Sequence, residues 1–70
     1  MDRNKRFLTP KQQLIMELIA EGLDTKQIAE ETNTSVSNIE KMITRILDKV
    51  DAHNRTNAVT QCFRRGIIGF

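Results

Sequence analysis

The chain has 70 residues, of which 39% are hydrophobic and 29% charged, so we expect one globular domain and neither a disordered chain nor a membrane span. The net charge of +2 is too small to identify a nucleic-acid-binding protein until the position of the charges is known. The single cysteine, Cys62, excludes an internal disulfide and has no ligands at zinc spacing around it. We therefore predict a cytoplasmic protein without a metal or cofactor.

Residues 1–7 carry three basic side chains, Arg3, Lys5 and Arg6, and no apolar segment of the kind that forms a secretory signal. We predict that they form a basic N-terminal arm outside the domain, which spans 8–70. A solvated, poorly ordered arm is favoured over one that contacts DNA.

The first predicted helix runs from about 10 to 21. Thr9 can cap it, Pro10 fits its first position, and Gln12 can complete a capping box. Gly22 supplies the left-handed residue that ends it. The apolar residues that repeat at helical spacing, and that we assign to the core, are Leu14, Ile15, Leu18 and Ile19.

A short second helix begins after Asp24, which forms a second capping-box pattern with Gln27. Its core residues are Ile28 and Ala29. The polar cluster at 32–34 predicts a turn.

Ser35 can cap the third predicted helix, which spans about 36–50. Apolar residues recur on it in steps of three and four, a spacing that gives one continuous stripe over four turns. They are Val36, Ile39, Ile43, Ile46 and Val50.

Asn54 can cap a fourth helix. We assign its apolar residues Ala58 and Phe63 to the core, whereas Val59 and Cys62 fit the core and a dimer interface equally well. No segment alternates with the period of a strand, so the predicted fold class is all-α.

A short helix and a longer one joined by a tight turn form the helix-turn-helix arrangement, whose second helix enters the major groove of DNA. At about 100° per residue, the side of the third helix opposite its apolar stripe is polar and partly basic. Composition alone slightly favours an ordinary solvated face over a DNA-reading one. The residues on that side are Ser37, Lys41, Thr44, Arg45 and Asp48, flanked by Asn38 and Lys49.

Five blocks of sequence between Leu8 and Ile68 resemble the LuxR-type (GerE/FixJ/NarL-like) domain of bacterial transcription regulators. They are Leu8-Thr9-Pro10-Lys11, Leu18-Ile19-Ala20-Glu21-Gly22, Lys26-Gln27-Ile28-Ala29, Asn54-Arg55-Thr56-Asn57-Ala58-Val59 and Arg64-Arg65-Gly66-Ile67-Ile68. The resemblance implies a four-helix helix-turn-helix domain of LuxR type. It also implies sequence-specific binding of double-stranded DNA by the third helix, and a homodimer formed through the fourth.

The chain departs from the family in the helix that would read DNA. The family usually carries Thr-Val-Lys-x-His where this chain has Asn-Ile-Glu-Lys-Met at 38–42. The usual lysine is replaced by Glu40, whose carboxylate repels phosphate but can accept a hydrogen bond from cytosine N4. Either a changed target sequence or a loss of DNA binding follows. The expected DNA-binding residues are Lys26, Ser37, Asn38, Glu40, Lys41, Thr44, Arg45 and Arg55.

The strongest alternative is a protein-interaction module of the same fold that binds another regulator or an RNA polymerase subunit. Glu40 and Met42 favour it, although DNA binding is preferred. An enzyme is a distant third, because His53 and Cys62 have no third group to orient them. We therefore expect no catalytic residues.

Overall fold

Four helices make up the described part of the chain, residues 8–69 of a computed structural model. They are α2 (Pro10–Ala20), α3 (Thr25–Glu31), α4 (Val36–Val50) and α5 (Arg55–Arg64). The described residues include no strand, which confirms the predicted all-α class. The predicted arm at 1–7 lies outside them.

Two of the helix starts carry the capping boxes that the sequence predicts. The Thr9 hydroxyl accepts from the Gln12 backbone N–H at 3.1 Å, and the Gln12 side chain accepts from the Thr9 N–H at 3.0 Å. Asp24 and Gln27 exchange the same pair of bonds at 2.8 and 2.9 Å. Each box satisfies two backbone donors that a helix start would leave exposed, and a cap of this kind stabilises a helix by about 1 kcal/mol.

The other two helix starts use a single cap each. Ser35 accepts from the N–H of Asn38 at 3.1 Å, and Asn54 accepts from the N–H of Asn57 at 2.8 Å. Ser35 directly follows the turn between α3 and α4, so the same residue ends the turn and starts α4. Both caps are as predicted.

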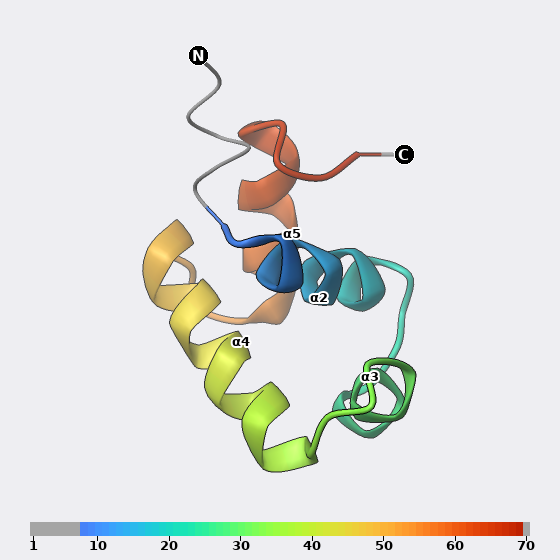
Figure 1. The fold of residues 1–70 in the computed structure, drawn as a ribbon. Helices are drawn as coiled ribbons and strands as arrows, with labels where there is room; N and C mark the ends of the chain where they lie inside the picture. Colours follow the sequence, from blue (N-terminus) through green and yellow to red (C-terminus); the bar gives the residue numbers. More distant parts are fainter. Residues whose placement is uncertain (1–7, 70) are drawn as a thin grey trace.

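Helix α2 lies across the middle of the molecule in front of α5, with α4 crossing on one side and α3 below (Figure 1). The buried residues of all four helices and of the two flanking segments form one core. Its members are Leu8, Ile15, Met16, Ile28, Ala29, Ile39, Ile43, Ile46, Val50, Ala58, Cys62, Ile67 and Ile68.

Two of the predicted core positions are wrong. Leu14 is 44% exposed, and Met16 is fully buried in its place. The two residues lie about 200° apart around the helix, so only one of them can face the core. Val36 is 42% exposed, because it is the first residue of α4 and lies beyond the part of the helix that packs on the core.

The assignments on α5 also need correction. Phe63 is 43% exposed rather than in the core, whereas Cys62 is fully buried. After Arg64 the chain turns back at Gly66, whose φ is +72°, and brings Ile67 and Ile68 into the core beside Cys62. These two isoleucines, and not Phe63, are the large apolar side chains that this end of the chain adds to the core. None of the described helices has the length and apolar character needed to cross a membrane.

Candidate nucleic-acid interface

The outer face of α4 is the polar surface that the sequence predicts. Its stripe from Ile39 to Val50 is buried against the other helices. Burial of this stripe fixes the rotation of α4 about its axis, so the opposite side of the helix faces solvent. All six α4 residues predicted to bind DNA are exposed: Ser37, Asn38, Glu40, Lys41, Thr44 and Arg45.

The charges on this face are separated around the helix axis. Glu40 lies about 100° from Lys41 and about 140° from Arg45, so the carboxylate is on one edge of the face and the cations extend to the other. The hydroxyl of Thr44 donates to the backbone carbonyl of Glu40 at 3.0 Å, which holds Thr44 against its own helix. Glu40 itself is exposed.

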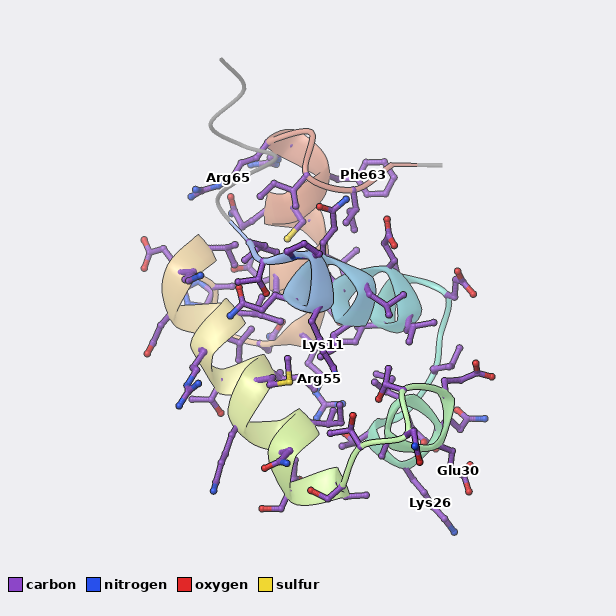
Figure 2. The ribbon with its side chains drawn as sticks, viewed as in Figure 1. Lys11, Lys26, Glu30, Arg55, Phe63 and Arg65 are labelled. Carbon is purple, nitrogen blue, oxygen red and sulfur yellow. The ribbon has the colours of Figure 1, made fainter. Side chains whose placement is uncertain are left out.

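The two predicted DNA-binding residues outside α4 are placed differently. Lys26, the second residue of α3, is exposed and lines a depression that also includes Ser35 and Val36 at the start of α4. Figure 2 shows Lys26 projecting from α3 away from the rest of the molecule. Arg55 is only partly exposed at the first residue of α5. The structure therefore places Lys26 next to the start of α4. Arg55 lies at the start of α5 and lines none of the depressions described on α4.

Sequence reasoning missed Lys11, in the first turn of α2. Its amine donates to the hydroxyl of Thr34 at 3.3 Å, and it lines a depression together with Lys41 and Arg45 of α4. No local pattern could have found this contact, because Lys11 and Thr34 are 23 residues apart. The contact depends on how α2 packs across the start of α4.

Among residues 8–69, the one clear shift of pKa concerns a buried group away from this surface. Burial raises the pKa of the Cys62 thiol, and nearby Arg65 partly offsets that effect. A buried thiol kept protonated is a poor nucleophile. Among the described residues, no cluster of His, Cys, Asp and Glu could hold a metal ion.

Residues 6–62 match the family described as bacterial regulatory proteins, luxR family. The chain belongs to this family. The four-helix fold is the one that the resemblance implied. Membership in a family of transcription regulators also agrees with the expectation that the chain is not an enzyme.

Several curated proteins are similar to this LuxR-family chain. "Probable transcriptional regulator ycf29" of Porphyra purpurea is 36% identical over 62 residues, which cover 89% of the chain and 30% of the relative. "Response regulator Rre1" of Synechocystis is 36% identical over 63 residues, 90% of the chain and 27% of the relative. "Transcriptional regulatory protein YdfI" of Bacillus subtilis is 36% identical over 66 residues, 94% of the chain and 31% of the relative.

The chain thus spans less than a third of the length of these relatives. No solved structure gives a significant match.

Proposed function

We propose that this LuxR-family domain regulates transcription by binding double-stranded DNA, with α4 in the major groove. The observation that carries the proposal is the outer face of α4, which is exposed, polar and held in one rotation by the buried stripe behind it. A helix with such a face can present hydrogen-bonding side chains to base edges. The printed names of the relatives, which include transcriptional regulators and a response regulator, support the same function.

Each side chain on this surface has a chemical role that fits DNA. Lysine and arginine pair with phosphate or with guanine O6 and N7, so Lys41 and Arg45 have the chemistry for either kind of contact. The amide of Asn38 suits adenine, and the carboxylate of Glu40 suits the amino group of cytosine. Lys26 adds a cation beside the start of α4. The surface therefore combines base-reading groups with phosphate-binding ones.

We further propose that the domain binds DNA as a homodimer through α5. Val59 is half-buried and Phe63 is 43% exposed on that helix. Cys62, which from sequence fitted the core and this interface equally well, is fully buried within one chain and has no surface to offer a second copy. The proposed seam therefore consists of Val59 and Phe63. A two-fold dimer predicts two inverted half-sites about 10 base pairs apart.

Fluorescence anisotropy with a labelled random-sequence duplex tests DNA binding directly. The logarithm of the binding constant should fall linearly with the logarithm of the salt concentration between about 50 and 200 mM, because binding releases counterions from phosphate. Selection of bound sites from a random pool should then return a preferred sequence. Absence of binding at the lowest salt concentration would reject the proposal.

A protein-interaction function is the second candidate, because Glu40 places a negative charge on the same exposed face. In that case the domain would bind another regulator or an RNA polymerase subunit. Failure of the wild type to bind DNA, together with binding by Glu40→Lys, would favour this candidate.

A further inference from the structure

A depression lies where the first turn of α2 meets the outer edge of α4. Three of the side chains around it are cations and none is a carboxylate. It is lined by Lys11, Thr34, Asn38, Lys41, Met42 and Arg45. By contrast, the depression along α3 between Leu23 and Glu31 is lined by two carboxylates. The cations are thus concentrated at the depression between α2 and α4 and are not spread evenly over the surface.

The α4 side of the depression follows from helix geometry. Asn38, Lys41, Met42 and Arg45 are spaced by three, four and seven residues, so they lie on one side of the exposed face, from Lys41 near its centre to Met42 at its edge. Met42 packs partly against the core, and the three polar residues of α4 all lie on the same side of it around the helix. This edge is the one turned away from Glu40, which lies about 160° around the helix from Asn38 and from Met42.

The α2 side depends on Lys11, whose position is fixed by a chain of hydrogen bonds. The Thr34 hydroxyl donates to the Thr32 carbonyl at 3.0 Å, so its oxygen is left to accept from the Lys11 amine, at 3.3 Å. A lysine ammonium has three donors, and Thr34 uses one of them. Figure 2 shows Lys11 reaching from the start of α2 toward α4. The remaining donors are available to a ligand in the depression.

The chemistry of these side chains suits a phosphate group. Gathering Lys11, Lys41 and Arg45 around one depression creates a positive potential that an anion relieves. The planar guanidinium binds two phosphate oxygens at once, and ammonium groups bind phosphate as point charges. The Asn38 amide can add one neutral donor. A phosphate has enough acceptor oxygens to use all four groups.

We infer that this depression is a phosphate site and that Lys11 is one of its cations. The inference rests on the proposed function: in the complex with DNA, the phosphate belongs to the backbone at the edge of the major groove. Phosphate contacts set the orientation of a protein on the duplex. A phosphate held on this edge of α4 fixes the rotation of the helix in the groove, so that Glu40 and Thr44 on the other edge face the bases.

NMR titration of the full chain with inorganic phosphate tests the site without DNA. Backbone amide signals of Thr34, Asn38 and Lys41 should shift in the wild type. Lys11→Gln should reduce those shifts several-fold. Arg64→Gln is the matched control, because it removes one exposed cation from the last turn of α5 and should leave the shifts unchanged. Equal shifts in the two variants would overturn the role of Lys11.

Anisotropy with a random-sequence duplex separates the two sources of phosphate. Lys11→Gln should weaken binding several-fold and reduce the slope of log affinity against log salt by about one, whereas Arg64→Gln should behave as the wild type. If the wild type binds DNA but the two variants behave alike, the inference fails and the proposed function stands. If the wild type binds no DNA while inorganic phosphate shifts the same amides, the proposed function fails and the site takes a free phosphate group. If neither ligand binds, both are wrong.

Discussion

Lys41 lies opposite the buried stripe of α4, at the centre of its exposed face. A side chain there meets phosphate or a base edge if α4 enters the groove. Lys41→Ala should therefore weaken DNA binding by about 1–3 kcal/mol if the lysine reads a base. Alanine is the best helix former, so the fold should survive. Anisotropy measures the loss, and unchanged affinity across several salt concentrations, with a native circular dichroism spectrum, would remove Lys41 from the interface.

Glu40 has the opposite effect on phosphate, because its carboxylate repels the backbone. Glu40→Lys should raise nonspecific DNA affinity and steepen the salt slope by about one unit, through one added phosphate contact. Glu31→Lys is the control, since it makes the same change of charge at an exposed position on the last residue of α3. Identical salt slopes for the two variants would show that net charge, and not position, decides the effect.

Which α4 residues are exposed could be predicted from the sequence, because an apolar stripe of four turns fixes the opposite side of a helix. The role of Lys11 could not. Its partner Thr34 lies on another element, and the pairing arises only when α2 packs across the start of α4. For the same reason, no pattern indicated that Lys26 lies beside Ser35.

At the level of the helices, the starts and the glycine stops at Gly22 and Gly66 were predictable, whereas the inward face of α5 was not. Each N-cap side chain accepts from a backbone N–H three residues later, so the local sequence is enough to predict the contact. The apolar stripe of α5 includes both Cys62 and Phe63, and its width did not show which of them faces the core. Its orientation is set by Ile67 and Ile68, which follow the turn at Gly66 and bury Cys62 instead of Phe63.

Helix α4 ends in a conformation that its sequence does not favour. Asp51, the first residue after it, has φ 56° and ψ 51°, the left-handed region that glycine adopts most easily. Its carboxylate also lies at the negative end of the helix dipole. Asp51→Gly should stabilise the fold by about 1 kcal/mol and raise the Tm by about 4–8 °C, measured by thermal unfolding.

The control for that substitution is Asp48→Gly, one turn earlier on the exposed side of α4. Glycine in a helix interior costs about 1 kcal/mol, so this variant should melt at a lower temperature than the wild type. Two variants that both lower the Tm would show that the left-handed conformation of Asp51 carries no strain.

Across the whole molecule, the proposed dimer seam on α5 and the proposed DNA-reading face on α4 lie on different helices. Phe63 is near the end of α5, at the opposite end of the molecule from Lys26 on α3 (Figure 2). A second copy that covers Phe63 therefore leaves α4 open to DNA. Two copies related by a two-fold axis would present two α4 helices to one side of a duplex.

Phe63→Glu should dissociate the proposed dimer without unfolding the chain, because the ring is 43% exposed and a carboxylate there stays solvated in the monomer. In a closed two-fold seam, the carboxylate would be buried next to the same carboxylate of the second copy, with no cation to neutralise either charge. Sedimentation velocity with a palindromic duplex should show two wild-type chains per duplex and one Phe63→Glu chain. Loss of the second chain should also weaken binding, because linked modules bind far more tightly than single ones.

Leu14→Glu provides a matched control, since Leu14 is 44% exposed and belongs to α2 and not to α5. It removes an equally exposed apolar side chain and adds the same charge, so it should leave two chains on the duplex. If Leu14→Glu and Phe63→Glu reduce occupancy alike, charge repulsion from DNA explains both and the α5 seam is wrong. A wild type that binds the palindrome as one chain, with selected sites lacking an inverted repeat, would reject the dimer itself while leaving DNA binding by α4 intact.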